Sequence, residues 1–164
     1  MKKILSLLLF VSITAFMSCK GDMSDMGPAG QDGIDGQDGN ANVKSYVTTI
    51  SAADWQFFDS HLWLIDLQVP IVTSQIASSG LVMTYLQEAN GEWYALPFSR
   101  STQNYFFWAK TEAVRIHSQN DSASPVKFAG KVRVVAVTSE GLMHNPDLDW
   151  TDYEAVKNQL QLPE

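Results

Sequence analysis

Three histidines are the side chains best suited to acid–base or metal chemistry near neutral pH: His61, His117 and His144. No two of them have the spacing of a zinc site, and the chain contains neither a Gly-x-Ser-x-Gly elbow nor a phosphate-binding glycine loop. A Ser-His-Asp triad, or the paired carboxylates of a glycoside hydrolase, assembles in space, so the sequence leaves both open. We therefore predict no catalytic residues, no metal site and no cofactor, with a small surface hydrolase of polysaccharide as the alternative.

The densest group of carboxylates lies in residues 147–154. Asp147, Asp149 and Thr151 alternate like the first ligands of a calcium loop, but the glycine that turns such a loop is missing. The spacing of Thr151 and Glu154 is that of a helix capping box, and acidic residues at a helix N-terminus interact favourably with its dipole. We predict that this run begins a helix and does not bind a metal.

Aromatic side chains fall on both faces of one predicted strand, residues 103–110. The two-residue period of a strand places Tyr105 and Phe107 on one face. Phe106 and Trp108 then share the other face. One pair should enter the core, and the second must be covered by the other sheet, a helix, a partner or a sugar. Flat aromatic rings suit stacking on sugars, and the tryptophans we consider for a ligand site are Trp55, Trp93 and Trp108.

Two pairs of basic side chains each share one face of a predicted strand. Arg115 and His117 form one pair, and Lys131 and Arg133 form the other. If the two strands are neighbours, the four groups make a basic patch that could bind an acidic glycan or an envelope protein. The alternative is the solvated face of a sheet.

The first residues have the pattern of an export signal. Lys2 and Lys3 precede an apolar stretch, residues 4–17, that is shorter than the roughly 20 residues that span a bilayer as a helix. Ser18 directly precedes Cys19, which resembles a bacterial lipobox, where the cysteine thiol receives a diacylglycerol and the leader is cut. We predict a lipoprotein signal peptide over residues 1–18 and lipidation at Cys19, whose acyl chains would anchor the protein in a membrane.

After Cys19, glycine recurs at every third position: Gly27, Gly30, Gly33, Gly36 and Gly39. A collagen triple helix needs this period because only glycine fits at its axis. Five triplets with one proline make an isolated triple helix marginal. We predict that residues 19–42 form a flexible, solvated collagen-like linker and that the protein is a monomer. A trimeric collagen-like assembly and calcium binding by the Asp-Gly pairs are the alternatives.

This order of features resembles a group of small collagen-like lipoproteins of Gram-negative bacteria. The shared features are a lipobox, a few Gly-x-y triplets and a junction that here reads Gly39-Asn40-Ala41-Asn42-Val43. The resemblance implies a compact C-terminal β domain, and a lipid anchor in the outer membrane or at the cell surface. It implies no activity for particular residues.

Composition bounds the rest of the chain. The 164 residues suggest one folded domain, which we place at residues 43–164. A net charge of −7 argues against a nucleic-acid partner, because phosphate binding needs a basic footprint. A single cysteine permits no internal disulfide, so an apolar core must hold the fold together.

From Val43 onward glycine becomes rare and β-branched and aromatic residues become frequent, which predicts strands separated by polar turns. The predicted strands include residues 43–50, a short segment at 54–58, residues 61–69, 103–110 and 131–138, with another around Val114 and Ile116. "SQNDSASP", residues 118–125, reads as a polar loop.

The strongest local signal is Asn90-Gly91 between two apolar stretches, which predicts a hairpin with a two-residue type I′ turn. That turn pairs Ala89 with Glu92, and Pro97 ends the return strand.

Near the C-terminus, the helical spacing of Tyr153, Val156 and Leu160 predicts one short helix packed on a sheet. We predict an all-β fold, either an antiparallel β-sandwich or a partly open barrel of seven or eight strands with this helix. The expected function is binding, adhesion or a structural role at the envelope of a Gram-negative bacterium, without catalysis.

Overall fold

The structure is a computed structural model. The structure describes residues 42–122 and 124–163. The predicted signal peptide, the lipidation site at Cys19 and the five glycine triplets lie outside the described residues, so they stay predictions.

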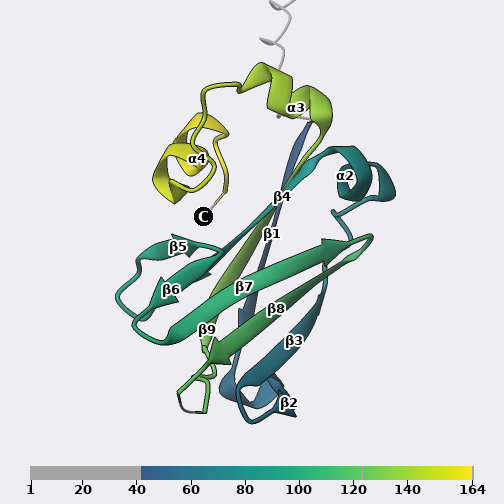
Figure 1. Ribbon diagram of the computed structural model, residues 1–164. Helices are drawn as coiled ribbons and strands as arrows, with labels where there is room; N and C mark the ends of the chain where they lie inside the picture. Colours follow the sequence, from purple (N-terminus) through teal and green to yellow (C-terminus); the bar gives the residue numbers. More distant parts are fainter. Residues whose placement is uncertain (1–41, 123, 164) are drawn as a thin grey trace, which may run out of the picture. The chain divides into compact units, whose positions relative to one another are not determined.

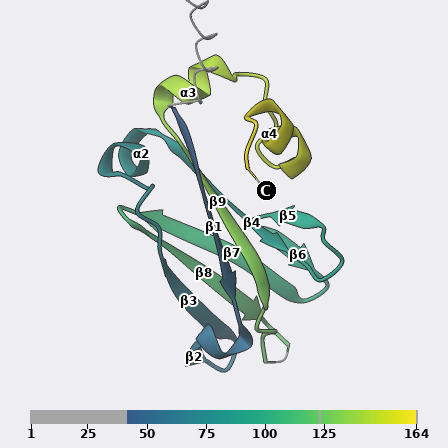
Figure 2. The same ribbon diagram turned by 180° about the vertical axis from the view of Figure 1, so that it is seen from behind.

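Two antiparallel sheets form a β-sandwich, which confirms the predicted fold class (Figure 1). The four-stranded sheet has the order β1, β9, β4, β5, which are Val43–Ile50, Gly130–Val137, Leu81–Gln87 and Trp93–Ala95. The five-stranded sheet has the order β2, β3, β8, β7, β6, which are Gln56–Asp59, Leu62–Gln68, Ala113–Asn120, Gln103–Lys110 and Phe98–Arg100. Figure 1 is seen from the side of β3, β8 and β7, and Figure 2 from the side of β1 and β9.

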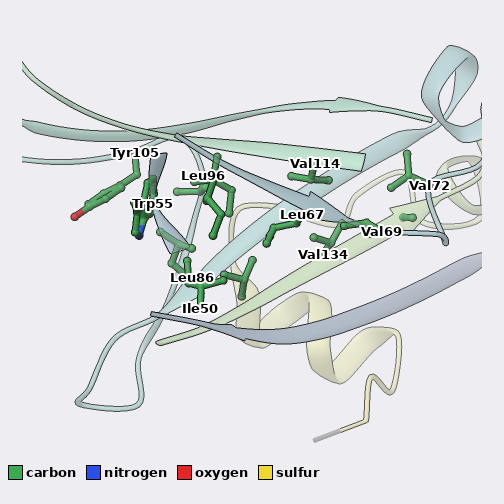
Figure 3. Packing of buried hydrophobic residues seen from close by; sticks show 14 of the residues in the cluster. Ile50, Trp55, Leu67, Val69, Val72, Leu86, Leu96, Tyr105, Val114 and Val134 are labelled. Atoms are coloured by element: carbon green, nitrogen blue, oxygen red, sulfur yellow. The ribbon is translucent and has the colours of Figure 1, made fainter. Parts of the chain in front are cut away.

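The main core lies between the sheets because one face of each strand is apolar. Leu67 on β3 and Val114 on β8 are opposite each other, and both join a cluster with Val134 of β9 from the other sheet (Figure 3). Val114 and Val134 are fully buried. Complete burial of a side chain of this size stabilises a fold by about 1.5–3 kcal/mol, so a cluster of this kind can replace the missing disulfides.

A second core covers the outer face of the four-stranded sheet. The C-terminal helix α4, Tyr153–Gln159, buries Tyr153 and Val156 against Tyr85 and Val135 of the sheet. Leu160, directly after the helix, joins the same cluster. This confirms the predicted C-terminal helix, and it explains why β9 is apolar on both faces.

The capping box predicted at the start of α4 is wrong. The N-cap is Asp152, whose carboxylate accepts a hydrogen bond of 3.1 Å from the backbone N–H of Ala155. Thr151 lies one residue before the N-cap and does not cap the helix. Its backbone N–H and its hydroxyl both donate hydrogen bonds to the carboxylate of Asp149, at 2.9 and 2.6 Å. The N-cap of α4 is therefore the carboxylate of Asp152, one residue after the predicted Thr151.

The β4–β5 hairpin also differs from its prediction, since its loop has three residues and not two. Glu88 donates its N–H to the carbonyl of Glu92 at 2.9 Å, and Gly91 donates its N–H back to the carbonyl of Glu88. Gly91 has φ +89°, whereas Asn90 has no positive φ, so this is not a type I′ turn. A turn followed by a glycine with left-handed backbone angles is typical of three-residue hairpin loops.

The extra loop residue shifts the register by one position. Trp93 lies opposite Gln87, where the two-residue loop would have placed it opposite Glu88. A shift of one residue moves a side chain to the other face of a strand. Trp93 consequently lies on the outer face of the sheet, on the same side as Arg133 and under α4.

Some elements were not predicted from the sequence. These are the 3₁₀ turn Ala52–Asp54, the helices α2 (Ser74–Ser79) and α3 (Ser139–His144), and the short strand β6. With β6, the described residues contain nine strands, more than the seven or eight expected. The loop predicted at 118–125 starts later, because β8 runs to Asn120 and Ser118 is buried, accepting a 2.8 Å hydrogen bond from Gln103.

Candidate functional site

The seven side chains predicted to bind a ligand do not form one site. Trp55 belongs to the core between the sheets, where it is almost fully buried and donates its Nε1–H to the carbonyl of Phe128 at 2.8 Å. No ligand can stack on a ring in this position without opening the core.

The basic patch that depended on two neighbouring strands does not form. β8, which carries Arg115 and His117, pairs with β3 and β7, whereas β9 pairs with β1 and β4 in the other sheet. The two basic pairs therefore lie on different sheets. Lys131 is exposed, but Arg133 is only 1% exposed, so these two do not form a solvated face either.

Arg133 and Trp93 pack beneath α4. The guanidinium carbon of Arg133 is 5.5 Å from the centroid of the Trp93 ring and 5.7 Å from that of Tyr153. The two rings stack on each other at 4.7 Å. The Nε and Nη1 atoms of Arg133 are buried and have no hydrogen-bond partner among the described residues. This side chain is held by two cation–π contacts and is not presented to solvent.

The remaining three candidates meet on the outer face of the five-stranded sheet. Trp108 lies directly opposite Arg115 across the β7–β8 ladder, and His117 is two residues further along β8. Arg115 is in turn opposite Asp66 of β3. The strand period adds Phe106 and Lys110 to this face. We call the surface formed by the following side chains the Trp108 face: Asp66, Phe106, Trp108, Lys110, Arg115 and His117.

An aromatic cluster forms one half of the Trp108 face. The rings of Phe106 and His117 are nearly parallel, 4.6 Å apart, and the ring of Trp108 meets His117 edge-on at 4.5 Å. Tyr105 and Phe107, on the other face of β7, pack against the core between the sheets, so they are the pair that enters the core, a choice that the sequence left open. Trp108 remains 64% exposed, so none of the described elements covers it.

An ion pair forms the other half. The Nε and Nη2 atoms of Arg115 donate to the two carboxylate oxygens of Asp66 at 2.7 and 2.8 Å. This bidentate pair fixes the plane of the guanidinium on the open sheet surface. The Arg115 guanidinium lowers the pKa of the Asp66 carboxyl, and Asp66 raises the pKa of Arg115, so both groups stay charged.

A shallow cavity of about 280 Å³ opens beside the pair. Its walls come from β3, β7 and β8, and they include the side chains of Trp108 and Lys110 as well as Asp66 and Arg115. The site therefore combines an exposed aromatic ring with fixed hydrogen-bonding groups, the combination that binding sites for polar ligands use.

His117 is not arranged as a catalytic base. It is 2% exposed, and burial first and the charge of Arg115 second lower its pKa, so it is neutral at pH 7. Its Nδ1 atom has no hydrogen-bond partner among the described residues. In a Ser-His-Asp triad this nitrogen would donate to a carboxylate, so His117 supports the aromatic cluster instead.

A larger cavity, about 430 Å³, lies between β5 and the start of α4. It contains three carboxylates, of which Asp152 caps the helix. Hydrogen bonds from Tyr94 and Asn90 lower the pKa of the Glu92 carboxyl, the opposite of what a general acid in glycoside hydrolysis requires. In residues 42–122 and 124–163, no three His, Cys, Asp or Glu side chains are grouped to bind a metal ion.

The candidate residues chosen from the sequence did not include Asp66, Phe106 or Lys110. The strand period had already placed Phe106 on the face of Trp108, and the same period would have added Lys110. Asp66 could not be found in this way, because its position depends on the register between β3 and β8, which lie 49 residues apart at this pair.

In comparisons with known proteins, the chain matches no family model, no curated protein and no solved structure. Within the described part of the chain, no helix has the length and apolar character needed to cross a membrane.

Proposed function

We propose that this protein is a non-enzymatic binding module that holds a glycan on the Trp108 face. The observation that carries the proposal is Trp108, a large aromatic ring left 64% exposed beside a fixed ion pair on an open sheet. An exposed indole ring beside fixed polar groups suits a ligand that has both an apolar face and hydrogen-bonding groups.

The chemistry of the face matches a sugar. One side of a pyranose ring presents C–H groups, which pack on an indole face, while the hydroxyls at its edge need donors and acceptors. Arg115 supplies donors in a fixed plane and Asp66 supplies acceptors, both at the wall of the same cavity. A sugar stacked on Trp108 would place its hydroxyls within reach of this pair.

The proposed setting is the outer membrane or surface of a Gram-negative bacterium. Acyl chains on Cys19 would anchor a monomer, and residues 19–42 would act as a spacer. If these 24 residues formed a flexible coil, they would span roughly 27 Å and would hold the domain clear of the headgroups. The support for this setting is the leader pattern and the glycine run, together with a β domain that begins at Val43.

A glycan array tests the proposal. The full chain, solubilised in mild detergent, should bind one class of oligosaccharide, and Trp108→Ala should abolish that binding. Phe58→Ala is the matched control, because Phe58 is also 64% exposed but belongs to β2. If the Trp108→Ala protein binds the array as the unaltered chain does, the Trp108 face is not the binding site.

A further inference from the structure

The Trp108 face is positively charged on an acidic protein. The cavity beside Trp108 is lined by two cations, Lys110 and Arg115, and one anion, Asp66, which gives a local charge of +1. The whole chain carries a formal charge of −7. A negatively charged ligand is therefore attracted to this cavity, whereas the acidic remainder of the protein repels it.

Some hydrogen-bond donors of the Trp108 face have no partner among the described residues. Both oxygens of Asp66 accept hydrogen bonds from Arg115, through its Nε and Nη2 atoms. The third nitrogen of Arg115, Nη1, has no partner among the described residues. Lys110, exposed at the end of β7, forms no ion pair with the described residues. Asp66 is thus neutralised by one cation, and a second cation is left over.

We propose that the glycan bound here is acidic, with a carboxylate or sulfate group held between Lys110 and the Nη1 atom of Arg115. This inference rests on the proposed function and adds the ligand's charge to it. In this arrangement the sugar ring stacks on Trp108, and its anionic group contacts the two cations that line the same cavity. Arginine and lysine both bind such oxygens, arginine in a fixed plane and lysine as a mobile point charge.

The arrangement predicts a dependence on ionic strength. The cations are exposed, so their attraction for an anionic sugar is screened by salt. The screening length falls from about 10 Å at 0.1 M to about 3 Å at 1 M ionic strength. Binding of an acidic sugar should weaken over this range, while stacking of a neutral sugar on Trp108 should hardly change.

The experiment uses matched pairs of ligands with the detergent-solubilised full chain. Uronate oligosaccharides are compared with their carboxyl-reduced counterparts, and sulfated oligosaccharides with their desulfated counterparts, by isothermal titration at 0.1 M and 1 M salt. At 0.1 M the anionic member of at least one pair should bind about two- to fivefold more tightly, the range expected for exposed charges. The pair that shows the difference identifies the acidic group.

Two variants locate the effect. Lys110→Met should lower the ratio of acidic to neutral affinity towards one, whereas Lys131→Met, which removes an exposed lysine from the other sheet, should leave that ratio unchanged. Equal binding of both members of every pair would overturn this inference and leave the proposed function standing. If no oligosaccharide binds at all, the proposed function fails, and this inference fails with it.

Discussion

Asp66 and Arg115 face each other across the β3–β8 ladder and join through two hydrogen bonds of 2.7 and 2.8 Å. An exposed ion pair contributes little to stability, because water solvates both partners well in the unfolded chain. Its geometric effect is larger. It holds a guanidinium flat on the sheet next to Trp108, where a ligand can use it.

Arg115→Met should separate binding from stability. We expect the glycan affinity to fall about tenfold, as for loss of a hydrogen bond from a charged donor, with little change in the melting temperature. Calorimetric titration and thermal unfolding of the same preparation measure both quantities. A large fall in melting temperature with unchanged affinity would mean that the pair is structural.

His117 should make the protein less stable in mild acid. Its pKa in the folded chain lies below the ordinary value of 6.5, so the unfolded chain binds its proton more readily. Its contribution to stability is complete above pH 6.5 and is lost as the pH falls through the folded pKa. The melting temperature should drop between pH 7.5 and 5.5, and His117→Phe should reduce the drop.

His144→Gln is the control for that measurement, because His144 is exposed at the end of α3. It should keep the drop seen in the unaltered protein. If His117→Phe and His144→Gln behave alike, burial of His117 is not the source of the acid sensitivity.

Arg133→Met should leave the protein as stable as before or stabilise it by about 1 kcal/mol. A buried guanidinium with unpartnered nitrogens has lost its hydration, and replacement of buried charge by an apolar side chain of similar length is often favourable. Urea unfolding measures the change, with Lys131→Met on the same strand as an exposed control. A loss of more than about 2 kcal/mol would show that the contacts with Trp93 and Tyr153 outweigh the desolvation of Arg133.

Cys19→Ala should release the protein from the membrane fraction, because the predicted anchor is the lipid on this thiol. Fractionation of cells followed by mass spectrometry of the N-terminus measures this. A variant that is processed normally and still sediments with membranes would contradict lipidation at Cys19.

Local pattern was enough to predict much of the fold. The β-branched and aromatic content of residues 43–50 and 103–110 predicted β1 and β7 with their observed bounds, since such side chains favour strands within a short stretch of sequence. The two-residue period of a strand placed Tyr105 and Trp108 on opposite faces of β7, without saying which face enters the core. The C-terminal helix followed from the spacing of its buried side chains.

Contacts that depend on pairing between strands far apart in the sequence could not be predicted. Arg133 looked like a surface residue because the sequence does not say that α4 covers β9. Because of the same limit, Arg115 and Lys131 could be placed in one basic patch although they lie on different sheets, and the partnership of Arg115 with Asp66 stayed hidden. In the β4–β5 hairpin, one extra loop residue was enough to move Trp93 to the opposite face.

The central claim, that a glycan binds at the Trp108 face, can be tested with the five tryptophans of the chain. Their indole N–H signals report on five places: Trp55 in the core, Trp63 on β3, Trp93 under α4, Trp108 on the proposed site and Trp150 before α4. Each can be followed by NMR while an oligosaccharide selected on the array is added. We predict that the Trp108 signal moves in a saturable way and that the Trp55 and Trp93 signals stay in place. Saturable movement of the Trp93 signal with a stationary Trp108 signal would contradict the account.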